Sequence, residues 1–189
     1  AVFADVVGGL HCAVQATLDD QGIEQLYCHQ ADAINLIRQG KNVVVVTGTA
    51  SGKTLCYNVP IIEGLIENAQ ATTLMLYPTK ALAQDQLRGV GKFLRADDDV
   101  NFLAGTYDGD TPAPLRRRLR DGGNLVLTNP DMLHQGILPH HARWNRFFTN
   151  LKHVVIDEVH AYRGVFGSHL ANVIRRLHRI CQHYGSNPQ

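Results

Sequence analysis

The chain has 189 residues and a formal net charge of +1 at pH 7, so it is not a strongly basic protein. Affinity for a polyanion would therefore need local positive patches rather than bulk charge. Hydrophobic residues make up 44% of the sequence, which argues against global disorder. No apolar run reaches the ~18 residues that a membrane span needs.

The first part of the chain is weakly patterned and is expected to be an N-terminal extension over residues 1–22, with a helix over 6–18. No signal peptide is recognisable, and four scattered cysteines without a C-x-x-C pair are typical of reduced thiols. We therefore expect a cytoplasmic protein, or a nuclear one in a eukaryote. Because the sequence begins at Ala1 rather than methionine, we also expect a piece of a longer protein.

Residues 26–38 have helical spacing of apolar side chains, and Gly40 is a suitable stop after them. Next come four β-branched residues, Val43–Val46, which predict a central parallel strand buried on both faces. The small-residue segment 47–54 follows, and then an apolar-periodic helix over 55–66.

Strand, small-residue loop and helix are the context that a phosphate-binding loop requires. The unpaired N–H groups and partial positive charge of a helix N-terminus favour a bound phosphate. Gly52 allows close approach of the backbone, Lys53 can reach the β and γ phosphates, and the Thr54 hydroxyl can ligate Mg²⁺. A strict P-loop pattern would place glycine at position 47, where this chain has threonine. The alternative is an ordinary tight turn with a surface lysine.

Four further strands are expected, over residues 72–77, 100–104, 125–128 and 153–156. Helical patterns cover 79–94, 113–121, 139–150 and 167–184. Thr79 and Asp131 are expected to cap the helices that follow them. Strands that alternate with helices predict an α/β fold with a parallel sheet, whose ligands gather at the carboxyl ends of the strands. We expect the loops at 47–54, 78–86, 105–112, 128–134 and 157–160 to share that edge.

Asp157 and Glu158 end an apolar strand, where an acidic pair is unfavourable without a partner. Beside a phosphate loop the partner would be Mg²⁺: Asp157 can hold the metal and Glu158 can orient and deprotonate water. The alternative is a strand end that dips into solvent. The single basic cluster, at 116–120, is expected to be an exposed helix face, with a nucleic-acid contact as the alternative.

Together these blocks resemble, in order, the first RecA-like domain of superfamily 2 DExH-box helicases. The resemblance implies a RecA-like parallel β-sheet flanked by helices on both faces, as in P-loop NTPases. The sequences of three blocks are similar to those of a narrower group, the Hrq/SftH/MrfA-type DNA helicases. These blocks are Leu26-Tyr27-x-His29-Gln30, the loop from Thr47 to Thr54, and Asp157-Glu158-Val159-His160-Ala161-Tyr162-Arg163-Gly164.

The resemblance implies ATP and Mg²⁺ as cofactors. Gln30 would read adenine, and His160 would couple the nucleotide state to motion. Thr54 and Asp157 would hold Mg²⁺, and Lys53 and Glu158 would act in hydrolysis. The nucleotide would lie on Thr49, Ala50, Ser51, Gly52, Lys53 and Thr54.

The resemblance also implies contacts between this domain and nucleic acid. They would be made mainly to backbone phosphates and sugars, which carry no sequence information and so suit a motor. The residues in these blocks are Pro78, Thr79, Lys80, Gly105, Thr106, Asp108, Gly109, Thr128 and Asn129. DNA is favoured over RNA by the resemblance alone.

The family's second RecA-like domain, which supplies an arginine finger, has no counterpart in residues 1–189. We therefore expect this domain by itself to bind nucleotide and hydrolyse it slowly or not at all. The alternatives are an RNA helicase, a double-strand translocase, a non-motor P-loop protein and a catalytically silent binding module. A transporter ATPase is disfavoured because no Ser-Gly-Gly-Gln-type signature precedes Asp157, and a silent module because Lys53 and Glu158 are intact.

Overall fold

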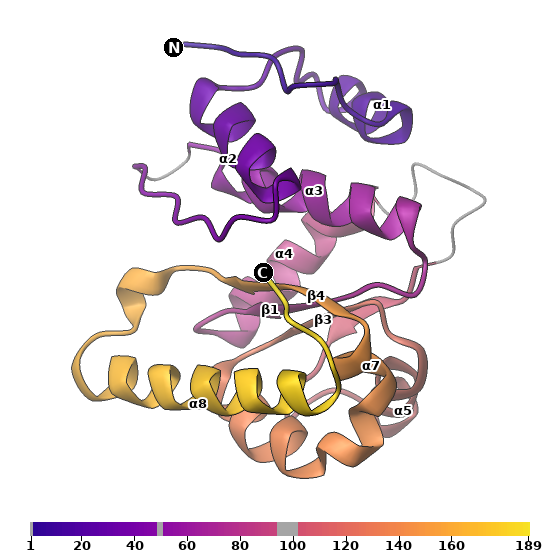
Figure 1. Cartoon of the computed structure of the whole chain (residues 1–189), viewed down its shortest axis with the longest axis vertical. Helices are drawn as coiled ribbons and strands as arrows, with labels where there is room; N and C mark the ends of the chain where they lie inside the picture. Colours follow the sequence, from indigo (N-terminus) through magenta and orange to yellow (C-terminus); the bar gives the residue numbers. More distant parts are fainter. Residues whose placement is uncertain (1, 49–50, 94–101) are drawn as a thin grey trace. The chain divides into compact units, whose positions relative to one another are not determined.

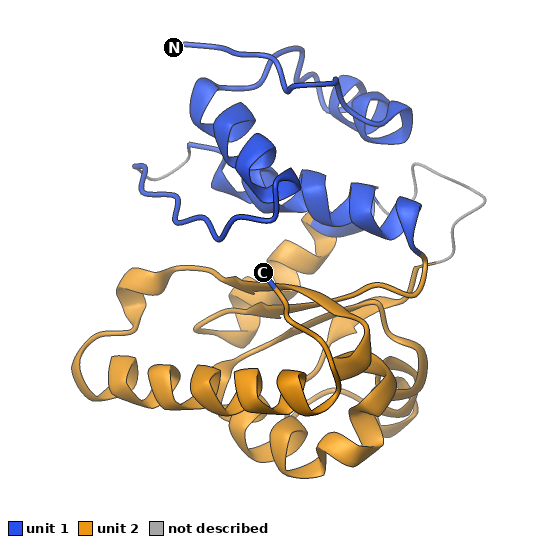
Figure 2. Cartoon of the chain, viewed as in Figure 1, with its two compact units in different colours: residues 1–68, 90–101, 189 blue, residues 69–89, 102–188 orange. Residues whose placement is uncertain are grey.

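The computed structural model describes residues 2–48, 51–93 and 102–189. The described chain forms two compact units, shown in Figure 2. Unit 1 comprises residues 1–68, 90–101 and 189, and unit 2 comprises 69–89 and 102–188. The single RecA-like domain expected over residues 1–189 stays a prediction.

Three helices lie wholly within the described residues of unit 1 (Figure 1): α1 (Cys12–Asp20), α2 (Cys28–Arg38) and α3 (Lys53–Glu67). Helix α1 begins six residues later than the predicted 6–18, because the chain turns at Val7 and Gly8 and residues 2–4 pair with the segment before α2. Helices α2 and α3 agree with the apolar periodicity of 26–38 and 55–66. Ile34, Val59 and Ile62 lie in their buried faces, each at most 2% exposed.

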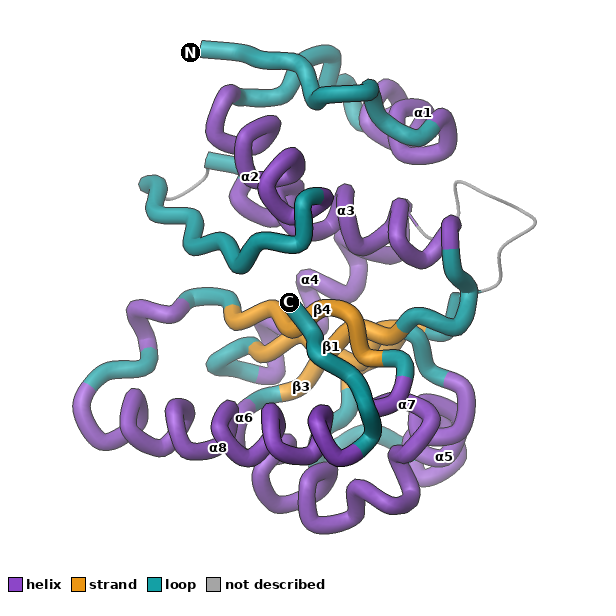
Figure 3. The backbone as a smooth tube through the Cα atoms, in the orientation of Figure 1, coloured by secondary structure: helices purple, strands orange, loops and turns teal. Residues whose placement is uncertain are grey.

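The prediction of a buried strand at Val43–Val46 is wrong. Residues 41–48 are loop in Figure 3, and Val44 and Val46 are 84% and 88% exposed. A run of β-branched residues raises the propensity for extended backbone, but a strand also needs a pairing partner. None of the ladders between the described strands includes these residues.

Unit 2 holds a four-stranded parallel sheet in the order β2-β3-β1-β4. The strands are β1 (Thr72–Leu76), β2 (Ala104–Thr106), β3 (Leu125–Thr128) and β4 (Leu151–Ile156). These strands confirm the α/β prediction, although β2 begins four residues later than the predicted 100–104. Residues 100 and 101 lie outside the described residues. Strand β4 is an edge strand, and its residues 153–156 are half-buried rather than buried as predicted.

The helices of unit 2 begin with α4 (Lys80–Phe93), which starts directly after β1 and extends into residues assigned to unit 1. Helices α5 (Ala113–Gly122), α7 (Asn145–Thr149) and α8 (Gly164–His183) lie on one side of the sheet, and α4 lies on the other (Figure 1). Between β3 and α7 the chain forms three short turns, α6 (Pro130–Met132), a π-helical turn (Leu133–Ile137) and a 3₁₀ turn (Leu138–Trp144). A further 3₁₀ turn, Val159–Ala161, joins β4 to α8.

Two predicted helix caps have different outcomes. The Thr79 hydroxyl accepts a hydrogen bond from the Leu82 N–H at 3.2 Å, which confirms that cap. The cap predicted at Asp131 is wrong, because the Asn129 side chain accepts from the Met132 N–H at 2.8 Å instead. The Asp131 carboxylate lies in the first turn of α6 and pairs with His169 at 3.2 Å.

One apolar cluster fills the space between the sheet and α5, α7 and α8. Leu74 and Leu76 of β1 pack there with Trp144, Phe147 and Phe148, all at most 1% exposed. Strand β1 is buried along its whole length, as its uninterrupted apolar and threonine sequence predicts. The stability of unit 2 therefore depends on aromatic side chains that follow β3.

We expect Phe148→Ala to lower the free energy of unfolding by about 3–5 kcal/mol, because it empties a fully buried site in this cluster. Phe166→Ala is the matched control, since Phe166 is 72% exposed and its loss should change stability by less than about 0.5 kcal/mol. Denaturant titrations of both variants test this. Equal losses of stability would contradict the assigned core.

Candidate functional site

Helix α3 begins at the Gly-Lys-Thr block. Its N-cap is Gly52, with a left-handed φ of +72°, a conformation that costs glycine little and other residues more. A β-carbon at this position would lie 2.4 Å from the Gln30 Nε2 atom. The left-handed backbone therefore favours glycine here, and a β-carbon would in addition displace the end of the Gln30 side chain.

The Lys53 ammonium lies folded back over the loop that precedes it. It donates to the carbonyl oxygens of Thr47 at 3.1 Å and Gly48 at 3.2 Å. The hydroxyls of Thr47 and Ser51 lie 2.5 Å apart across the same loop. Thr49 and Ala50, also predicted to bind nucleotide, lie outside the described residues. Lys53 thus lies at the start of α3, and a bound anion can replace the two carbonyl oxygens as the acceptor of its hydrogen bonds.

The Gln30 side chain is 2% exposed and joins the start of α2 to this loop. Its Oε1 accepts from the Tyr27 N–H at 2.9 Å, and its Nε2 donates to the Gly52 carbonyl at 2.9 Å. The neighbouring His29 Nε2 lies 3.1 Å from the Ser51 carbonyl oxygen. Two consecutive side chains of α2 therefore contact two consecutive carbonyls at the start of α3.

Three rings stack beside Gln30. The Phe3 and Tyr27 centroids are 5.3 Å apart at an interplanar angle of 15°, and those of Tyr27 and His29 are 5.7 Å apart at 11°. Phe3 and Tyr27 are 47% and 39% exposed, so the stack is open to solvent. Sequence reasoning missed this stack. The alternation of Tyr27 and His29 was visible, but Phe3 is brought there only by its antiparallel bridge to Tyr27.

The second group of predicted residues follows the strands of unit 2. All four strands are parallel, so the segments 78–86, 105–112, 128–134 and 157–160 leave the sheet at the same edge. This confirms their predicted convergence. The loop at 47–54 belongs to unit 1, and its convergence with them stays a prediction.

Glu158 has a strained backbone. Its φ of +51° is the only positive value for a non-glycine residue in the described part of the chain. Its N–H donates to the Asp157 carboxylate at 2.8 Å, and its own carboxylate lies 3.1 Å from His160 Nδ1. Such strain costs of order 1–3 kcal/mol and is concentrated at functional sites. Asp157, Glu158 and His160 are thus linked to one another by these two contacts.

Tyr162 lies just beyond this block. Burial, together with the negative charges of Asp157 and Asp131, raises the pKa of its hydroxyl to about 12. The phenol therefore stays neutral beside the acidic pair. In the described ranges 2–48, 51–93 and 102–189, no three or more His, Cys, Asp or Glu side chains are grouped to hold a metal.

The predicted nucleic-acid residues divide into two classes. Residues of the first class are buried and make hydrogen bonds or packing contacts within the protein. The Asp108 carboxylate is 4% exposed and accepts from the N–H groups of Asp110 and Thr111 at 2.8 and 3.1 Å. The Thr128 hydroxyl donates to the Tyr107 carbonyl at 2.6 Å, and Gly105 packs on Leu119.

The second class is accessible. Thr79, Lys80 and Gly109 are exposed, and Pro78, Thr106 and Asn129 are half-buried. The Lys80 ammonium pairs with Asp110 at 2.6 Å, which ties the loop after β1 to the loop after β2. This hydrogen bond raises the pKa of Lys80, so the ammonium stays charged. The exposed members of the predicted nucleic-acid residues therefore lie in these two loops, and their contacts with nucleic acid stay a prediction.

The basic cluster is an exposed face only in part. Arg116 turns inward: its guanidinium donates to the carbonyls of Asp108 and Gly109 at 2.6 and 2.8 Å and lies 5.7 Å from the Tyr107 ring centroid. Arg117 and Arg118 are exposed, and Arg120 pairs with Asp121 at 2.9 Å. One member of the cluster thus supports the 105–112 loop.

The sequence pattern that defines the DEAD/DEAH box helicases matches residues 27–187. The chain belongs to this family. It is 51% identical over 175 residues to the uncharacterized ATP-dependent helicase YprA of Bacillus subtilis, covering 93% of this chain and 23% of that protein. It is 45% identical to the ATP-dependent helicase hrq1 of Schizosaccharomyces pombe, covering 92% of this chain and 16% of the relative.

The family's fold is also matched in solved structures. The DUF1998 helicase MrfA bound to DNA and AMPPNP superposes with a TM-score of 0.95 and 48% identity, over 100% of this chain and 26% of that one. The RecA-like fold predicted from the sequence is therefore confirmed. The chain spans about a quarter or less of these relatives. Across the described helices, none is long and apolar enough to cross a membrane.

We expect Gly52→Ala to lower the free energy of unfolding by about 2–4 kcal/mol, because it strains the left-handed backbone and displaces the Gln30 amide. Gly89→Ala is the control: it lies in α4 with open space around it and should stabilise the protein by up to about 1 kcal/mol. Denaturant titrations measure both. A neutral Gly52→Ala would contradict the geometry of the loop.

Proposed function

We propose that this chain is the ATP-binding part of a DNA helicase or translocase, in which Mg-ATP hydrolysis drives movement along a strand. The observation that carries the proposal is the start of α3, where the Lys53 ammonium donates to two loop carbonyls beside the N-terminus of the helix. A triphosphate would accept hydrogen bonds from the Lys53 ammonium and from the N–H groups of the helix together, because both attract negative charge.

Adenine recognition is assigned to Gln30. Each atom of its amide makes one hydrogen bond within the protein, to Tyr27 and to Gly52. A side-chain amide has a second N–H and a second acceptor lone pair, which remain for the base edge. The exposed rings of Tyr27 and Phe3 supply an apolar surface beside it, on which a base can stack.

Hydrolysis is assigned to the block at 157–160. Thr54 and Asp157 would hold Mg²⁺, which neutralises the charge of the phosphates when it is bound. A hydroxyl and a carboxylate are oxygen ligands of the kind that this ion prefers. Glu158, held in its strained conformation beside Asp157, would orient and deprotonate the attacking water. His160 contacts Glu158 and would link the state of the site to motion.

DNA is proposed as the track because MrfA, bound to DNA, is 48% identical, whereas the RNA helicase DeaD of Escherichia coli is 31% identical. Contacts would come mainly from Thr79, Lys80 and Gly109, with Pro78, Thr106 and Asn129 beside them. A further RecA-like domain is proposed as partner, since the chain spans only 16–26% of the relatives named above. The cytoplasmic or nuclear location stays a prediction.

The proposal is tested by ATP hydrolysis in the full-length protein, with single-stranded DNA, duplex DNA or single-stranded RNA added. We expect strong stimulation by single-stranded DNA and its loss in Lys53→Ala. Stimulation by RNA alone would indicate an RNA helicase, and stimulation by duplex DNA alone a double-strand translocase. Hydrolysis that depends on Lys53 but responds to no nucleic acid would contradict the motor function.

Residues 1–189 by themselves should bind ATP but hydrolyse it slowly, because an arginine finger is worth ~10³-fold or more in rate and is expected from the further domain. Binding and turnover are measured on the same preparation by titration and by phosphate release. Glu158→Gln should retain the binding and abolish the residual turnover. Rapid, nucleic-acid-stimulated turnover by residues 1–189 would disprove the need for another domain.

A further inference from the structure

Helix α2 is attached to helix α3 at both of its ends. At its start, the Gln30 amide donates to the Gly52 carbonyl at 2.9 Å. At its last residue, Arg38 pairs with Glu63 in the fourth turn of α3. The two attachments are separated by eight residues of α2, or about 12 Å of helix. The helix can therefore neither slide nor tilt on α3 without breaking one of them.

The Arg38–Glu63 pair is partly buried and bidentate. Arg38 Nε lies 3.0 Å from Glu63 Oε2, and Nη2 lies 2.6 Å from Oε1. The two side chains are 28% and 10% exposed. Two parallel hydrogen bonds from a planar guanidinium fix orientation as well as distance, which a single point charge cannot do.

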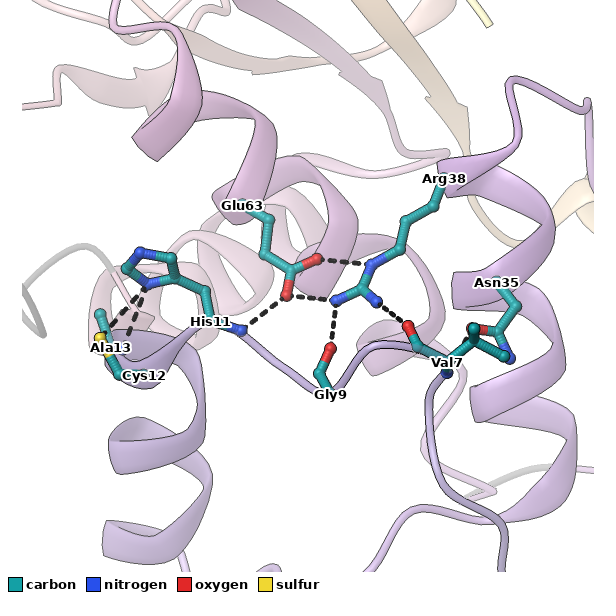
Figure 4. Close-up of polar contacts among 8 residues, drawn as sticks. All are labelled: Val7, Gly9, His11, Cys12, Ala13, Asn35, Arg38 and Glu63. Atoms are coloured by element: carbon teal, nitrogen blue, oxygen red, sulfur yellow. Dashed lines mark hydrogen bonds and ion pairs between the residues drawn. The ribbon is translucent and has the colours of Figure 1, made fainter.

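The N-terminal strap, which we define as residues 2–11, closes over this pair (Figure 4). Arg38 donates to the carbonyls of Val7 and Gly9 at 2.8 and 2.9 Å, and Glu63 accepts from the His11 N–H at 3.0 Å. The Val7 N–H donates to the Asn35 side chain at 2.9 Å. Arg38 thus makes four hydrogen bonds with a group that has five N–H donors, so lysine cannot replace it.

The other end of the N-terminal strap lies at the start of α2. The Ala4 N–H donates to Leu26 at 3.1 Å, and the Cys28 N–H donates to Val2 at 2.9 Å. Phe3 stacks there on Tyr27, the residue whose N–H holds the Gln30 amide. The strap therefore runs from the Gln30 end of α2 to the Arg38 end and is bonded at both.

We propose that Arg38 is a positioning residue for base recognition: with Glu63 and the N-terminal strap, it fixes α2 on α3 and so sets the Gln30 amide against a bound base. This inference rests on the proposed function. The phosphates would be bound by the loop and by the first residues of α3, with which Arg38 makes none of its four hydrogen bonds. Loss of the pair should therefore weaken discrimination between bases more than it weakens binding of phosphates.

The test compares ADP with GDP, titrated calorimetrically into the full-length protein and into Arg38→Lys. We expect the preference for ADP over GDP to fall about fivefold in Arg38→Lys, the value of one hydrogen bond. A purely structural loss would lower the folded fraction and affect both nucleotides equally, so it would leave this ratio unchanged. An unchanged ratio would overturn the proposal.

Arg120→Lys is the matched control. The Arg120 side chain has the same exposed fraction, 28%, and pairs with Asp121 at 2.9 Å in unit 2. Arg120→Lys should leave the preference for ADP over GDP as in the parent protein. A fall in this variant equal to that in Arg38→Lys would also overturn the proposal. If Arg38→Lys does not fold, Asn35→Ala takes its place, because it removes only the bond to Val7. A fall in its ratio supports the proposal and an unchanged ratio overturns it.

The parent protein separates this inference from the proposed function. If it binds neither ADP nor GDP, the nucleotide site itself is wrong. If it binds both without preference, base reading by Gln30 is wrong, and the role of Arg38 with it. If it prefers ADP and Arg38→Lys keeps that preference, only the role of Arg38 is wrong.

Discussion

The hydrogen bond from the Gln30 amide to the Gly52 carbonyl is the constraint on which unit 1 depends. A β-carbon at position 52 would displace the amide from this bond, and the left-handed backbone there also favours glycine. The hydrogen bond also aligns the start of α2 with the start of α3, where Lys53 and the free helical N–H groups lie. Recognition of a base and binding of phosphates are thereby assigned to the ends of two helices that are bonded to each other.

Unit 2 depends on a different constraint, the parallel direction of its strands. Parallel strands deliver every following loop to one sheet edge, so residues distant in sequence meet there without specific attraction between them. The aromatic cluster under the sheet anchors the strands, and the left-handed backbone at Glu158 is tolerated because β4 is paired beside it. A stable core thus supports a strained residue at the position proposed to activate water.

Much of this was predictable because it is local. Thr72–Leu76 and Leu125–Thr128 are strands where apolar runs predicted them, and α3 begins at the Gly-Lys-Thr block. The strand predicted at Val43–Val46 is absent, because propensity cannot supply a pairing partner. Asp131 does not cap α6, because the Asn129 side chain accepts the hydrogen bond from the Met132 N–H. The roles of individual site residues stay predictions, although the structure shows which of them are exposed.

By itself, the sequence determined the family, the alternation of strands and helices, and the loops that carry lysine and the acidic pair. These features follow from short-range patterns that each segment contains within itself. Only the tertiary structure decided that residues 2–11 bind along α2, that Phe3 stacks on Tyr27, and that Arg38 pairs with Glu63 across 25 residues of sequence. An arginine or a phenylalanine has many possible partners at such separations. The choice among them is made by packing and desolvation, which exist only once the chain has folded.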